Sequence, residues 1–98
     1  MAKINWTSEA EFWLKDIYDF IARDNPKAAA RVVSGIYKKA RILKDFPEIG
    51  YKYKGEPEGD IRILLYGHYR IAYLIRSKNI IDILGVFHGS LDIERYLL

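Results

Sequence analysis

The stretch IRILLYGHYRIAYLIRSKNIIDILGVF, residues 61–87, decides the fold, because three runs rich in branched and aromatic residues follow one another in it. The runs are separated only by GH and by SKN. Branched and aromatic side chains favour strands, and separations this short suit tight hairpins. The stretch therefore predicts three consecutive antiparallel strands that form a meander.

Alternation along the three runs predicts two different faces of the sheet, because successive side chains of a strand point in opposite directions. One face is wholly apolar and is expected to lie under helices; it comprises Ile61, Ile63, Leu65, Tyr69, Ile71, Tyr73, Ile75, Ile81, Ile83 and Phe87. The other face mixes charged and aliphatic residues, namely Arg62, Arg70, Arg76, Asp82 and His88 with Leu64, Leu74, Leu84 and Val86. Such a face suits a partner that brings both apolar groups and negative charge.

Upstream of the meander, residues 3–6 predict a short strand, and two helices follow it. Thr7 or Ser8 is suited to cap the first helix, whose apolar residues recur at helical spacing. Pro26 is suited to open the second helix behind Asp24 or Asn25, so the two helices form a hairpin. The segment 45–60 is rich in proline, glycine and charge and is expected to be a long loop.

The chain beyond residue 89 predicts a short C-terminal helix capped by Ser90 or Asp92. The expected fold is therefore α+β: an N-terminal strand, a two-helix hairpin, a three-strand antiparallel meander and a short C-terminal helix. A length of 98 residues suits a single domain over residues 1–98.

Composition excludes several classes of protein. The chain has no cysteine, which rules out disulfides and cysteine-based zinc sites, and its two histidines are too few to indicate a metal site. No phosphate-binding glycine loop is present, so no cofactor is expected. No apolar run approaches the roughly 20 residues of a membrane span, which favours a cytoplasmic protein without membrane contact. A net charge of +3 is only a weak preference for anionic partners.

Five strings spread along the chain resemble the RelE/ParE superfamily of type II toxin–antitoxin toxins. They are W-T-x-x-A and N-P-x-A-A at the two helix starts, F-P-E-I-G after the second helix, Y-R-I-A-Y in the middle strand, and V-F-H-G-S-L-D after the last strand. The resemblance is closer to the ParE branch. The chain departs from that branch at Leu91-Asp92, where arginine-aspartate is common, and at Tyr51, where an arginine often follows P-x-x-G.

This resemblance implies a toxin that is neutralised by a cognate antitoxin and that arrests growth by inhibiting DNA gyrase. The alternative is a RelE-like endoribonuclease that cuts mRNA on the ribosome, and a third possibility is a member whose only partner is its antitoxin. Whether the chain is an enzyme stays open, although the lack of a complete catalytic set favours a binding toxin. Fold alone does not decide among the three.

The candidate site residues follow from these hypotheses. A ribonuclease needs a base, an acid and a cation beside the phosphate, and these roles suit Glu56 or Glu58, His88, and Arg70 with Arg62. Binding to a target by charge suits Lys52, Lys54, Arg62, Arg70 and Arg76. Several also have a purely structural interpretation. His88 and Gly89 can be a strand end and a turn, and Arg70 can form an ion pair with Asp82. Lys52 and Lys54 can lie in a solvated loop, where Glu56, Glu58 and Asp60 offset their charge.

Overall fold

The structure, a computed structural model, describes residues 2–77 and 79–89. Its elements are, in chain order, β1 (Lys3–Trp6), α1 (Ser8–Ala22), α2 (Pro26–Ala40), the short 3-10 helix η1 (Arg41–Lys44), β2 (Tyr51–Glu56), β3 (Gly59–Tyr66), β4 (Tyr69–Ser77) and β5 (Ile80–His88). The expected α+β fold with an N-terminal strand and a helical hairpin is confirmed. The expected C-terminal helix lies outside the described residues.

Both helices begin where side-chain caps were expected. The Thr7 hydroxyl accepts a hydrogen bond from the Ala10 N–H at 3.1 Å and donates one to the carbonyl of Ile83 at 2.7 Å. Asn25 accepts a hydrogen bond from the Ala28 N–H, with Pro26 as the first helical residue. Thr7 therefore caps α1 and also joins that helix to the last strand.

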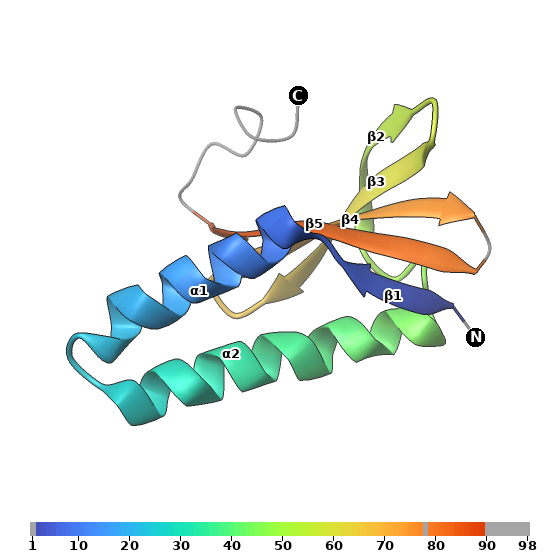
Figure 1. The fold of residues 1–98 in the computed structure, drawn as a ribbon. Helices are drawn as coiled ribbons and strands as arrows, with labels where there is room; N and C mark the ends of the chain where they lie inside the picture. The colour runs from blue at the N-terminus through green and yellow to red at the C-terminus, as the bar shows by residue number, and fades with distance from the viewer. Residues whose placement is uncertain (1, 78, 90–98) are drawn as a thin grey trace.

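The sheet has five strands in the order β1-β5-β4-β3-β2 (Figure 1). β1 is parallel to β5, and every other neighbouring pair is antiparallel. The prediction that the whole segment 45–60 is a loop was wrong, because residues 51–56 form β2 and extend the meander to four strands. Strand pairing overrides the polar composition here, since an outer strand needs only one neighbour and tolerates charged residues.

The two helices lie side by side against one face of the sheet (Figure 1). Leu14 of α1 and Ile36 of α2 are buried in one cluster with Ile71, Tyr73 and Ile83 of the sheet. α2 approaches β3 closely at Gly35, where a Cβ atom would overlap the hydroxyl group of Tyr66. No helix in the described part of the chain is long and apolar enough to cross a membrane.

The strand register overturns part of the predicted division into two faces. The turn between β3 and β4 contains only Gly67 and His68, so Tyr66 pairs with Tyr69. Counting back from that pair places Arg62 opposite Tyr73 and Leu65 opposite Arg70. Even-numbered residues of β3 therefore share the helix-covered face with odd-numbered residues of β4, and Ile61, Ile63 and Leu65 lie on the other face, contrary to the prediction.

A second departure from simple alternation occurs in β5. Ala72 pairs with Gly85 but Tyr73 pairs with Ile83, which leaves Leu84 as an extra residue in a β-bulge. The bulge reverses the alternation beyond it. Val86 is consequently buried in the cluster under the helices, while Phe87 belongs to a smaller cluster with Ile63 and Ala72.

Candidate functional site

Arg62 and Arg70, predicted to lie on one face, lie on opposite faces of the sheet. Arg62 pairs with Tyr73 on the side of the helices, whereas Arg70 pairs with Leu65 and Phe87 on the other side. The prediction placed the apolar residues of β3 on the face under the helices. The two-residue turn at Gly67 and His68 fixes the register of β3 against β4 instead, and this register turns those residues to the other face. The mixed face predicted from the sequence is therefore divided between the two sides.

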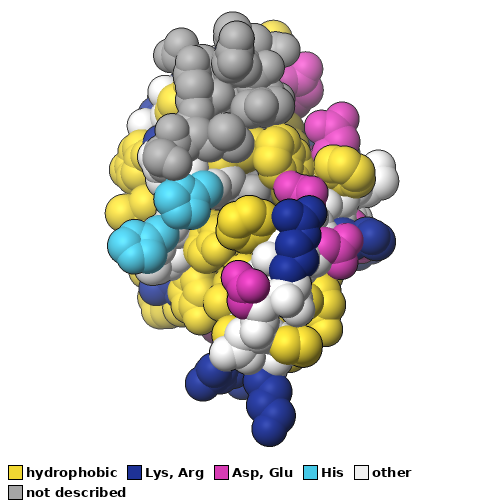
Figure 2. Space-filling model, turned by 90° about the vertical axis from the view of Figure 1, so that its left-hand side faces the viewer, with side chains coloured by type: hydrophobic (Ala, Val, Ile, Leu, Met, Phe, Trp, Pro, Cys, Tyr) yellow, Lys and Arg dark blue, Asp and Glu magenta, His cyan; other side chains and the backbone are white. Residues whose placement is uncertain are grey.

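His88 also lies on the side of the helices, because the bulge at Leu84 reverses which face the later residues of β5 point to. It pairs with Tyr69, and the two rings meet edge to face with their centroids 5.8 Å apart. The ring of His68, in the turn, stacks on it at 6.3 Å. Figure 2 shows the two imidazoles side by side at the surface. The prediction that His88 shares a face with both arginines was wrong.

Arg62 is bound to the protein's own backbone. Its Nη1 donates hydrogen bonds to the carbonyl oxygens of Glu48 at 3.1 Å and of Gly50 at 2.7 Å. Its Nε is buried and forms no hydrogen bond within the described residues. Through its Nη1 contacts Arg62 binds the backbone of the F-P-E-I-G segment, so Nη1 is already used and is not open to an external anion.

Tyr73 holds the same segment from inside the core and was not singled out from the sequence as a functional residue. Its hydroxyl donates a hydrogen bond to the carbonyl of Pro47 at 2.7 Å and accepts one from the Gly50 N–H at 3.0 Å. Burial raises the pKa of Tyr73 above its ordinary value of 10.0, although the Gly50 N–H and the charge of Arg62 act in the opposite direction. The only sequence signal was a tyrosine among aliphatic residues on the inward side of a strand.

Asp82 forms its ion pair with Arg76, not with Arg70. The Nε atom of Arg76 lies 2.6 Å from Oδ2 of Asp82, and Asn5 donates a hydrogen bond to the other carboxylate oxygen. Arg70 instead donates a hydrogen bond of 3.2 Å to the carbonyl of Gly89. The register explains the choice of partner, since Asp82 lies opposite Leu74, which is four residues from Arg70 but only two from Arg76.

Both lysines of the predicted basic loop lie in β2, next to carboxylates. Lys54 is 2.8 Å from Glu56, and Lys52 is 3.6 Å from Asp60 across the strand pair. These contacts agree with the interpretation in which acidic neighbours offset the charge of the loop. An incoming phosphate or carboxylate has to compete with them.

The four residues considered for ribonuclease chemistry do not converge. Glu56 pairs with Gly59 near the Ile75 end of β4, whereas His88 pairs with Tyr69 at the opposite end of that strand. Six residues of β4 separate the two positions, which corresponds to about 20 Å at roughly 3.4 Å per residue. Within the described residues, no group of three histidine or acidic side chains is arranged to hold a metal ion.

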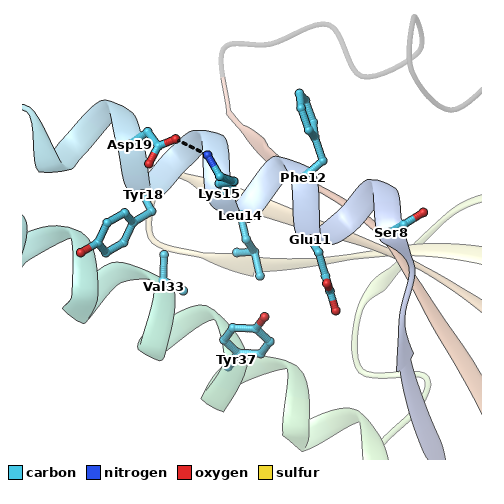
Figure 3. Close-up of a pocket in the computed structure, with 9 residues that line it drawn as sticks. All are labelled: Ser8, Glu11, Phe12, Leu14, Lys15, Tyr18, Asp19, Val33 and Tyr37. Atoms are coloured by element: carbon cyan, nitrogen blue, oxygen red, sulfur yellow. Dashed lines mark hydrogen bonds and ion pairs between the residues drawn. The ribbon is translucent and has the colours of Figure 1, made fainter.

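The two helices enclose a groove of about 650 Å³ on the outer surface (Figure 3). Leu14 and Tyr18 of α1 face Val33 and Tyr37 of α2 across it, and the ring of Phe12, at its outer edge, is directed away from α2 (Figure 3). Lys15 and Asp19 form an ion pair of 3.0 Å at its rim. Phe12 is 67% exposed, as is Phe20 of the same helix at 69%.

Comparisons with known proteins agree with this architecture. The family model described as "ParE toxin of type II toxin-antitoxin system, parDE" matches residues 4–93. Among solved structures, the chain is similar to one titled "Chromosomal ParDE TA system from P. aeruginosa", with 21% sequence identity and a TM-score of 0.74. That match covers 92% of this chain and 98% of the other. A comparison with curated protein sequences gave no match.

Proposed function

Because the chain belongs to the family of ParE toxins of type II toxin–antitoxin systems, we propose that it arrests growth by binding and inhibiting DNA gyrase in the cytoplasm. A cognate antitoxin is proposed to neutralise it. The resemblance in sequence and the family match support both proposals. The arrangement of the charged residues supports a binding mechanism over a catalytic one.

The dispersion of the candidate ribonuclease residues is the observation that carries this choice. RNA cleavage through a ribose 2′-hydroxyl needs a base, an acid and a cation around one phosphate. Here Arg62 is hydrogen-bonded to two backbone carbonyls, Arg70 lies on the opposite face, and Glu56 lies at the other end of the sheet from His88. A surface that only binds needs no such convergence.

Arg70 is the proposed centre of the target-binding surface. It is half-buried on the face away from the helices, opposite Leu65 in the adjacent strand, which is 55% exposed. A guanidinium group beside an exposed leucine offers a partner one charge-assisted contact and one apolar contact. Lys52, Lys54 and Arg76 remain secondary candidates, because each already has a carboxylate partner.

The groove between α1 and α2 is the proposed antitoxin site. Tyr18 and Tyr37 give it apolar walls, and Lys15 with Asp19 gives it a polar rim. This combination suits an amphipathic segment that becomes ordered on binding. Binding there would cover the partly exposed rings of Tyr18 and Tyr37.

Two assays on purified protein test the proposed target. The native protein and His88→Gln are compared for inhibition of DNA supercoiling by gyrase and for cleavage of mRNA on programmed ribosomes. We expect the native protein to inhibit supercoiling and to leave the mRNA intact, and His88→Gln to keep most of the inhibition, because a binding surface needs no proton transfer. Ribosome-dependent cleavage that disappears in His88→Gln would overturn the proposal in favour of an endoribonuclease.

Growth of cells that express the protein at matched levels tests the toxin–antitoxin assignment. We expect arrest without the neighbouring partner gene and recovery with it. Tyr18→Asp places a charge in the helix groove and should abolish recovery while leaving the arrest itself. Equal growth with and without the partner would contradict an active toxin.

A further inference from the structure

The segment that runs from α2 through η1 is basic without interruption. Residues 26–44 contain six cationic side chains and no carboxylate: Lys27, Arg31, Lys38, Lys39, Arg41 and Lys44. The nearest acidic residues in the chain are Asp24 and Asp45, one on each side of it. α1 differs in kind, since it contains Glu9, Glu11, Asp16 and Asp19 against a single lysine.

Four of the six cations form a straight stripe along α2 and onto the first residue of η1, namely Lys27, Arg31, Lys38 and Arg41. At about 100° of rotation per residue they fall within roughly 80° of one another, and the stripe is about 21 Å long at 1.5 Å per residue. All four are exposed, and the opposite side of the helix contributes Ala29, Ile36 and Ala40 to the core. Figure 2 shows basic side chains projecting from the lower edge of the molecule, with the acidic ones above them.

The stripe forms no ion pair within the described residues. The ion pairs of that part of the chain use Lys15, Lys52, Lys54 and Arg76 instead. Like charges four residues apart on a helix, as at Lys27 and Arg31, destabilise it slightly. Four such charges in a row, unrelieved by any carboxylate of the helix, are a surface to which an extended anion can bind.

We propose that this stripe binds the phosphate backbone of duplex DNA. The position between Arg31 and Lys38 on the stripe is Ser34, and the exposed ring of Tyr37 lies to one side of the stripe, at the groove between the helices. Stable contact with a protein segment normally depends on buried aromatic or aliphatic anchors, whereas contact with phosphates needs only cations. The chemistry therefore favours a nucleic acid over an acidic peptide, and a straight stripe follows one strand of a regular duplex.

The inference does not depend on which protein the toxin inhibits. The stripe should bind DNA directly, so purified toxin should bind DNA with no other protein present. Four phosphate contacts predict that log K falls against log salt concentration with a slope of about −3.6, from roughly 0.9 per contact. Non-specific binding of this kind typically has dissociation constants of about 10⁻⁴ to 10⁻⁶ M at physiological salt. No sequence preference is expected.

Fluorescence anisotropy with a labelled 20-base-pair duplex of mixed sequence, on the full chain between about 50 and 200 mM salt, tests the proposal. Lys38→Gln should make the slope shallower by about 0.9, and Arg31→Gln with Lys38→Gln by about 1.8. Lys3→Gln is the matched control, since Lys3 is an exposed lysine on β1, where the alternate residues Ile4 and Trp6 face the helices. It should leave the slope unchanged, and thermal melts should show all variants folded.

Three results would overturn the inference. The first is no binding at the lowest salt concentration, and the second is an equal change of slope in Lys38→Gln and Lys3→Gln. The third is tighter binding of a labelled polyglutamate peptide that depends on Lys38 and that the duplex does not displace, which would assign the stripe to an acidic protein partner. Failure to inhibit gyrase, by contrast, leaves the anisotropy result unaffected, so the two proposals fail separately.

Discussion

The hydroxyl group of Tyr73, fully buried in the middle of β4, accepts a hydrogen bond of 3.0 Å from the backbone N–H of Gly50, 23 residues earlier in the chain. The same hydroxyl donates to the carbonyl of Pro47, and Arg62 binds the carbonyls of Glu48 and Gly50. Two side chains of the sheet therefore hold the segment between η1 and β2. That segment exposes Phe46 and Ile49 while its backbone is bound to the core.

Removal of the Tyr73 hydroxyl should destabilise the protein. Tyr73→Phe leaves the Gly50 N–H and the Pro47 carbonyl without this partner, which costs about 1–3 kcal/mol for buried groups. Thermal or urea unfolding measures the loss. Tyr51→Phe is the control, since Tyr51 is 49% exposed and should change the free energy of unfolding by less than about 0.5 kcal/mol. Equal stability of the two variants would show that the hydroxyl of Tyr73 contributes nothing.

Stability should fall at alkaline pH. Burial raises the pKa of Tyr73 above 10.0, and burial together with the charge of Glu11 raises that of Tyr37. The folded state then holds protons that the unfolded state releases above pH 10, so the contribution is complete below that pH and is lost as the pH rises through the folded pKa. Urea unfolding between pH 8 and 11 measures this. Tyr73→Phe should show a shallower decline, and an identical decline would contradict the assignment to Tyr73.

Gly59 should tolerate no side chain. Its φ is +148°, and a Cβ atom there would overlap the carbonyl oxygen of Ile75 in β4. Gly59→Ala should therefore cost more than about 2 kcal/mol, from backbone strain together with displacement of β3 from β4. Gly55→Ala, in the paired strand, is the control, because the nearest atom to its Cβ is 3.9 Å away. A Gly59→Ala protein as stable as Gly55→Ala would contradict the register described here.

Arg62 and Arg70 should behave differently when each is replaced by alanine. Arg62→Ala removes two hydrogen bonds from a charged donor to the 48–50 backbone and should cost about 1.5–3 kcal/mol. Arg70→Ala should cost less than about 1 kcal/mol, because the hydrogen bond from Arg70 to the Gly89 carbonyl is exposed to solvent, yet it should reduce toxicity. Unfolding curves and growth assays on both variants separate stability from function. A large loss of stability in Arg70→Ala would assign that arginine to the fold.

The sequence by itself determined the local structure, because the signals for it are local. Thr7 and Asn25 mark the helix starts by accepting hydrogen bonds from the N–H three residues further on, and Pro26 marks one by its fixed φ. The apolar runs of residues 61–87 mark three strands, and five short strings mark the family. The basic stripe of α2 is equally local, since it depends only on which residues recur at helical spacing.

Only the tertiary structure decided which side chains meet. One extra residue at Leu84 moved His88 to the helix side, and hydrogen bonding across Gly67 and His68 placed Arg62 there too. Residues 51–56 form the strand β2 because their backbone pairs with the edge of β3, although their composition favours a loop. Side chains along a strand point alternately to the two faces of the sheet. One bulge or a shift of register by one residue therefore reverses the face to which every later side chain points. Composition does not encode such a shift, because it is decided by the pairing of strands.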